Sequence, residues 1–112
     1  MVSGRIPAPS YRKVYEEGRS AGNRYLVLYY LPGEVGLKLG ISVGKKLGKA
    51  VLRNKLKRRV REAFRKIMPR LEKSGELVFI VRRSATACTY GDIENAMKDL
   101  LKRMELLGNA DA

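Results

Sequence analysis

The strongest chemical signal in this sequence is a block of positive charge between residues 45 and 66. The block holds eleven cations and one anion, Glu62, so it carries +10 of the formal net charge of +13. The cations are Lys45, Lys46, Lys49, Arg53, Lys55, Lys57, Arg58, Arg59, Arg61, Arg65 and Lys66. Such side chains bind phosphate, and a charge concentrated in one segment indicates a binding surface for a polyanion.

Two plainer explanations of this charge are weaker. A solvated helix face usually mixes lysine and glutamate in ion pairs, which this block does not do. A membrane-surface helix needs apolar bulk at the interface, whereas the apolar residues here are needed by the core. We therefore expect a nucleic acid as the partner, with no membrane contact and no obligate protein partner.

The chain has few groups that could cut a nucleic acid unaided. It contains no histidine, and Asp92, Glu94, Asp99 and Glu105 are scattered where capping and solubility are their ordinary roles. Cys88, the only cysteine, has no base partner and is typical of a packed residue. An internal disulfide and a Cys/His zinc site are excluded. We expect no catalytic residue and no metal site, with a protein-only nuclease or a structural RNA-binding protein as alternatives.

Hydrophobic periodicity predicts that the cationic block lies on a helix from about Lys49 to Met68. Its apolar residues fall within an arc of about 120° and should face the core. They are Leu52, Leu56, Val60, Ala63, Phe64 and Ile67. Arg53 and Lys57 flank one side of this stripe, and the outer face carries Asn54, Arg58, Arg61 and Arg65. Nearly the whole wet surface of the helix is therefore cationic.

The elements before this helix are a short helix and two strands. The pattern predicts a helix over about 11–17 with Ser10 as its cap, on which Tyr11, Val14 and Tyr15 share a face. A strand over 24–31 alternates its side chains between two faces. Strict alternation over 37–43, after the turn that begins at Pro32 and Gly33, predicts a second strand, which we expect to form a hairpin with the first.

The elements after it are a strand and a last helix. The apolar density of residues 76–82 predicts a central strand. Thr89 and Asp92 resemble a capping box for a helix whose apolar stripe begins at Ile93 and ends at Gly108. No repeat or second domain is visible, so residues 1–112 are expected to form a single domain with an irregular segment at 1–9. With no bilayer-length apolar run and no signal-peptide core at the start, we expect a soluble cytoplasmic protein.

The cationic helix also carries a long motif. Residues 45–61 read K-x-x-G-x-A-V-x-R-N-x-x-K-R-x-x-R, which resembles the signature of the bacterial ribonuclease P protein family. Upstream, residues 11–18 are similar to the family's aromatic-x-x-V-aromatic-x-x-G opening, and Asn23 followed by Arg24 also fits. The resemblance covers about residues 10–106.

This resemblance implies a fold and a function that the residues alone do not give. The implied fold is an α+β two-layer sandwich with a four-stranded sheet, about three helices and a left-handed βαβ crossover, close to a domain of a ribosomal protein. The implied function is that of the protein subunit of ribonuclease P. In that family the ribonuclease P RNA, with bound Mg²⁺, removes the 5′ leader of precursor tRNA, and the protein binds both RNAs without stably holding a cofactor.

The resemblance also implies the residues that bind RNA. Tyr11, Tyr15 and Tyr29 would hold the leader, and exposed aromatic rings can indeed stack on unpaired bases without reading their sequence. The residues themselves leave open that the tyrosines are merely core. The signature positions would contact the leader or the RNA subunit: Lys45, Lys46, Arg53, Asn54, Lys57, Arg58 and Arg61. Gly48 would allow close approach or the turn into the helix.

One region departs from the family pattern. The usual basic residues before the first aromatic are reduced to Arg5, and Pro7 and Pro9 replace a more helical lead-in. The RNA contacts that the family makes from that end are therefore not expected to carry over.

Overall fold

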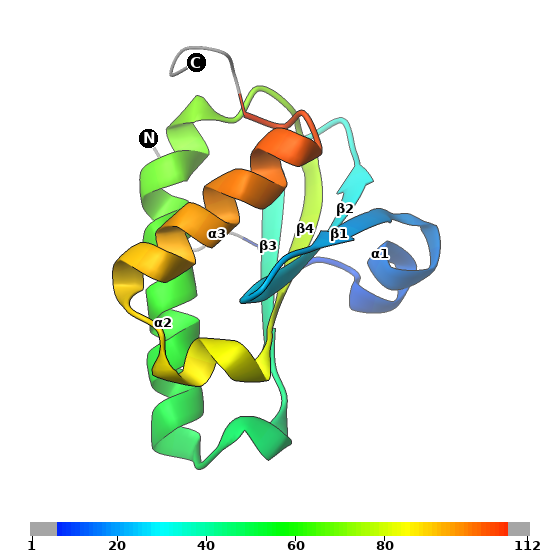
Figure 1. Ribbon diagram of the computed structural model, residues 1–112. Helices are drawn as coiled ribbons and strands as arrows, with labels where there is room; N and C mark the ends of the chain where they lie inside the picture. The colour runs from blue at the N-terminus through cyan, green and yellow to red at the C-terminus, as the bar shows by residue number, and fades with distance from the viewer. Residues whose placement is uncertain (1–6, 108–112) are drawn as a thin grey trace.

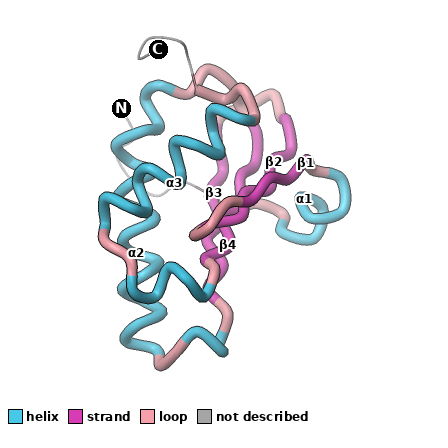
Figure 2. The backbone as a smooth tube through the Cα atoms, in the orientation of Figure 1, coloured by secondary structure: helices cyan, strands magenta, loops and turns pink. Residues whose placement is uncertain are grey.

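The computed structural model describes residues 7–107, which form a mixed four-stranded sheet covered by helices (Figure 1). The strands are β1 (Arg19–Gly22), β2 (Leu26–Pro32), β3 (Leu37–Val43) and β4 (Gly75–Val81). The α-helices are α1 (Tyr11–Glu17), α2 (Ala50–Ile67) and α3 (Tyr90–Arg103) (Figure 2). Three short 3-10 helices connect them: η1 (Lys45–Leu47), η2 (Met68–Arg70) and η3 (Arg83–Ala87). The predicted α+β sandwich is confirmed.

The order of strands across the sheet is β1-β2-β4-β3, so β4 separates β2 from β3. β4 is antiparallel to β2 and parallel to β3. The predicted hairpin between residues 24–31 and 37–43 is therefore wrong, because those strands do not pair. Parallel strands need a long crossover connection, and α2 with its flanking 3-10 helices supplies it. This crossover is left-handed, against the usual right-handed rule, as the family resemblance implies (Figure 1).

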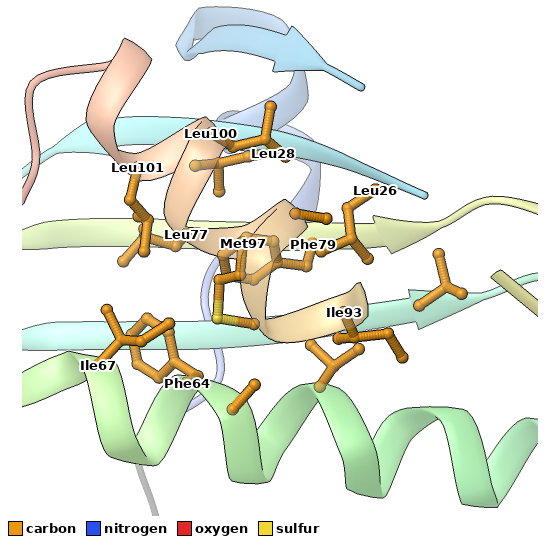
Figure 3. Close-up of a cluster of buried hydrophobic side chains, with 14 of the residues drawn as sticks. Leu26, Leu28, Phe64, Ile67, Leu77, Phe79, Ile93, Met97, Leu100 and Leu101 are labelled. Carbon is orange, nitrogen blue, oxygen red and sulfur yellow. The ribbon is translucent and has the colours of Figure 1, made fainter. Parts of the chain in front are cut away.

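The main hydrophobic core lies between the sheet and the pair α2 and α3 (Figure 3). The strands contribute every second residue, because alternate side chains face the helices. The largest fully buried members are Leu26, Leu28, Phe64, Ile67, Leu77, Phe79, Ile93, Met97, Leu100 and Leu101. The rings of Phe64 and Phe79 meet edge to face at 6.1 Å between centroids, which fixes α2 on β4. The stripe predicted for α2 is buried as expected, except that Leu52 is only partly covered.

α1 packs on the opposite face of the sheet. Its one buried residue is Val14, and Val78 of β4 is buried on the same side of the sheet, outside the main core cluster. Ser10 occupies the cap position as predicted, but its side chain makes no capping hydrogen bond. Its backbone N–H instead donates to Oε1 of Glu76 at 2.7 Å, which ties the start of α1 to β4.

The sequence pattern does not predict β1, an edge strand with mostly exposed side chains. Asn23, in the turn that follows it, joins the sheet to α3. Its Oδ1 accepts from the backbone N–H groups of Tyr25 and Leu26, and its Nδ2 donates to the carbonyl of Ala96 at 2.9 Å and to Asp99 at 3.0 Å. Hydrogen bonds from Arg103 and from Asn23 lower the pKa of Asp99.

α3 begins and ends on defined capping contacts. The predicted capping box is confirmed, because the Thr89 side chain accepts from the Asp92 N–H while the Asp92 carboxylate accepts from the Thr89 N–H. The predicted end at Gly108 is wrong, and Gly108 itself lies outside the described residues. The helix ends at Arg103 because Glu105 adopts a φ of 59°, and the N–H of Leu106 then donates to the carbonyl of Leu101.

The segment before α1 has no regular structure over residues 7–10, as expected, while residues 1–6 lie outside the described range together with Arg5. The carbonyl of Pro7 accepts a hydrogen bond from the N–H of Leu39 at the outer edge of β3, and Pro9 is buried. Among residues 7–107, no helix combines the length and apolar character that crossing a membrane requires.

We predict that Asn23→Ala lowers the free energy of unfolding by about 1–3 kcal/mol, because it leaves backbone groups of β2 and α3 without their partner. Urea denaturation of the free protein measures this. Asn54→Ala is the matched control, since Asn54 is an exposed residue within α2 and alanine favours the helix. Equal stability of the two variants would contradict the assignment.

Candidate nucleic-acid interface

Three tyrosines form a row on the face of the sheet that α1 covers. The ring centroids of Tyr11 and Tyr15 are 6.4 Å apart, and those of Tyr15 and Tyr29 are 5.0 Å apart, both pairs edge to face. Tyr11 is 37% exposed and Tyr15 39% exposed, whereas Tyr29 on β2 is half-buried. The structure thus brings together the three tyrosines predicted for RNA binding and places them beside the core, with ring surface open to solvent.

The strand register shows what lies beneath this row. Tyr29 on β2 pairs with Val78 on β4, which pairs with Gly40 on β3, so these residues form one line across the sheet. The next line contains Val27, Ile80 and Ser42, all partly exposed. Together they form the floor of a shallow surface that α1 borders on one side.

Ser42 also contacts the tyrosine row. Burial raises the pKa of Tyr15, and a hydrogen bond with the side chain of Ser42 opposes that rise. Tyr15 is therefore a neutral hydroxyl that can exchange hydrogen bonds. Sequence patterns did not mark Ser42 or Gly40, because only the pairing of β3 with β4 brings them to this surface.

The cationic side chains of α2 lie on the other side of the molecule, since α2 packs against the opposite face of the sheet (Figure 1). Asn54, Arg58 and Arg61 are exposed on its outer surface, and Arg53 and Lys57 are half-buried beside the apolar stripe. This matches the predicted arrangement around the helix. The side chains of Lys57, Arg58 and Arg61 form no salt bridge with the carboxylates of residues 7–107, so their charge is available to a partner.

Lys45 and Lys46 connect the two surfaces. They lie exposed in η1, directly after the end of β3 that carries Ser42, and they precede α2. The turn between them and α2 depends on Gly48, whose φ of 153° is unfavourable for other residues and whose missing Cβ would lie 2.7 Å from Leu52. The carbonyl of Gly48 accepts a hydrogen bond from Nε of Arg53 at 3.1 Å. Gly48 therefore makes the turn into the helix, as predicted.

Two cations of the block have contacts within the protein instead. Arg59 donates to the carbonyl of Cys88 at 3.1 Å, and the ammonium of Lys66 lies 5.0 Å from the centroid of the Tyr90 ring. Both contacts hold α2 against the segment that leads into α3. These two residues were not among the predicted RNA-binding positions, and their contacts within the protein give them a structural role.

The described residues offer little to a hydrolytic mechanism of their own. No three candidate metal ligands gather within residues 7–107. Cys88 is buried, and burial raises the pKa of its thiol, so it is a poor nucleophile. The arrangement is that of a surface which binds a polyanion and unpaired bases.

The family model of ribonuclease P matches residues 7–105 of the chain. This chain belongs to the ribonuclease P protein family. It is 41% identical over 98 residues to the ribonuclease P protein component of Clostridioides difficile, a match that covers 86% of each chain. It is 44% identical over 95 residues to that of Clostridium botulinum, which covers 83% of this chain and 86% of the relative.

Solved structures of ribonuclease P proteins share the fold. The protein from Staphylococcus aureus superimposes with a TM-score of 0.80 at 35% identity, covering 88% of this chain and 91% of the other. The protein from Thermotoga maritima gives a TM-score of 0.78 at 34% identity, covering 84% and 90%. Membership of the ribonuclease P family supports a role in tRNA 5′ processing and an association with ribonuclease P RNA.

We predict that Arg53→Ala or Lys57→Ala weakens binding to ribonuclease P RNA and flattens its salt dependence. Removing one phosphate contact should reduce the slope of log K against log[salt] by roughly 0.7 to 0.9. Binding titrations over a series of salt concentrations measure this. Lys73→Ala is the control, because Lys73 is exposed in the loop before β4, away from η1 and α2. Slopes equal to that of the control would sink the assignment.

Proposed function

We propose that this protein is the subunit of ribonuclease P that binds the catalytic RNA and the 5′ leader of precursor tRNA. The observation that carries the proposal is the pairing of an open tyrosine row with an unneutralised cationic helix on a chain that belongs to the ribonuclease P family. The cut itself is assigned to the RNA subunit, and the protein acts as a binding subunit in the cytoplasm.

The tyrosine row suits an unpaired leader. A ring that is partly exposed presents its π face to a base, and such stacking tolerates any base because every base has a π face. Tyr11, Tyr15 and Tyr29 are held by packing against each other and against the sheet, so little conformational freedom is lost when RNA binds. Leaders of different sequence can therefore bind the same surface.

The cationic helix suits a folded RNA backbone. Arg58 and Arg61 project from a rigid helix whose other face is fixed in the core, so the guanidinium groups are presented at fixed spacing. α2 and the tyrosine row lie on opposite faces of the sheet, which favours two different RNA partners over a single one. We assign α2 to the RNA subunit and the tyrosine row to the leader, with Lys45 and Lys46 near both.

Magnesium enters this proposal only through the RNA. Because no three candidate ligands gather among residues 7–107, the side chains of the chain do not fit a metal site of their own. The protein's contribution is its positive charge, which neutralises phosphates that the RNAs would otherwise need cations to screen.

We predict that the protein supports cleavage of precursor tRNA by a bacterial ribonuclease P RNA at low Mg²⁺ concentration. The measurement compares protein alone, RNA alone and both together. Cleavage in the combined sample only is expected, because the cations of α2 replace part of the Mg²⁺ requirement. Cleavage by protein alone would identify a nuclease, and no effect of the protein would leave a general RNA-binding protein.

We predict that Tyr29→Ala weakens binding of leader-containing precursor tRNA by about 1–3 kcal/mol, the usual contribution of one base stacked on an aromatic ring. The same variant should bind mature tRNA normally. Tyr29→Phe is the matched control, because phenylalanine keeps the ring. Circular dichroism distinguishes loss of the stack from loss of the fold, and unfolding of Tyr29→Ala would assign Tyr29 to the core instead.

A further inference from the structure

Gly40 lies in the middle of β3, where a glycine is unexpected. A glycine inside a strand weakens it, because it has no side chain to pack and loses more freedom on folding than other residues. The backbone does not require glycine there, since the glycines with positive φ in the described chain are Gly36, Gly48 and Gly75. The reason for Gly40 must therefore be the space around it.

The space above Gly40 is filled by the outer end of the Tyr11 ring. A Cβ built at Gly40 would lie 2.5 Å from the hydroxyl oxygen of Tyr11, 2.6 Å from its Cζ and 2.8 Å from its Cε2. Any side chain at this position would occupy the volume that the ring now holds. Gly40 itself is buried, whereas Tyr11 keeps 37% of its surface exposed.

This contact determines how far the tyrosine row reaches. Gly40 is the last residue of the line that runs from Tyr29 through Val78 across the sheet. Tyr15 contacts Tyr29, and Tyr11 contacts Tyr15 and continues to the edge strand β3. The ring of Tyr11 can lie down on β3 only because residue 40 has no side chain.

We infer that Gly40 is a positioning residue for leader recognition, because it seats Tyr11 as the third ring of the row. The inference rests on the proposed binding of the leader to the tyrosines. A side chain at position 40 displaces the far end of a flexible residue rather than backbone, so the fold is retained while the ring of Tyr11 moves away. The row is then reduced to Tyr15 and Tyr29.

The test is Gly40→Ala in the assembled ribonucleoprotein, with binding measured for precursor tRNA and for mature tRNA that lacks the leader. We expect leader-dependent affinity to fall roughly tenfold, which corresponds to about 1.4 kcal/mol and lies within the range for one stacked base. Binding of mature tRNA should not change. Gly91→Ala is the matched control, since a Cβ there meets only the Thr89 hydroxyl, at an ordinary 3.7 Å.

A double-mutant cycle with Tyr11→Ala tests whether Gly40 acts through Tyr11. In the Tyr11→Ala background the ring is absent, so adding Gly40→Ala should cause no further loss. An equal, additive loss in that background would overturn the inference. If Gly40→Ala alone does not fold, a folded double variant still supports the steric contact, and an unfolded one overturns it.

Tyr29→Ala separates failure of this inference from failure of the proposed function. A loss of leader binding in Tyr29→Ala with normal binding in Gly40→Ala would reject the role of Gly40 alone. Normal leader binding in both variants would reject the tyrosine row as the leader site, and with it the role of Gly40.

Discussion

Because β3 pairs with β4 in parallel, the chain must return from one end of the sheet to the other between these strands, and α2 makes that return. The rest of the binding surface follows from this constraint. The crossover puts the cationic helix on one face of the sheet and leaves the other face to α1 and the tyrosines. It also places η1, with Lys45 and Lys46, at the strand end beside Ser42. One pairing thus determines both binding surfaces and the link between them.

The cationic helix is held in place by its apolar side. Like charges on one helix repel each other, and Glu62 is the one acid within α2, so pairing on its surface cannot compensate. The buried stripe through Leu56, Val60 and Phe64 supplies the stabilisation, with the Phe64 to Phe79 contact at its centre. Phosphates of a bound RNA would remove the repulsion, so RNA binding should also stabilise the fold.

Most of the longer elements were predictable because their signals are local. The stripe of α2 and the capping box at Thr89 need only nearby residues. The pairing of β3 with β4, the edge strand β1 and the end of α3 at a non-glycine residue were not predictable, since each is decided by contacts distant in sequence or by an exception to a local rule. For the site, helical spacing joined Tyr11 to Tyr15, but only the sheet register brings in Tyr29, Ser42 and Gly40. The cationic positions were recognisable because charge imbalance survives without knowledge of the fold.

The hydrogen bond between Pro7 and Leu39 bears on how the protein avoids self-association. β3 is an edge strand, and the free N–H and C=O groups of an edge can pair with a strand of another molecule and start aggregation. Here the carbonyl of Pro7 occupies the N–H of Leu39, and the buried Pro9 follows two residues later. Proline has no N–H to offer a ladder, so the covering segment cannot itself become a new edge. The proline-containing lead-in that sets this chain apart from the usual family pattern therefore protects the sheet from growing by addition of a neighbouring chain.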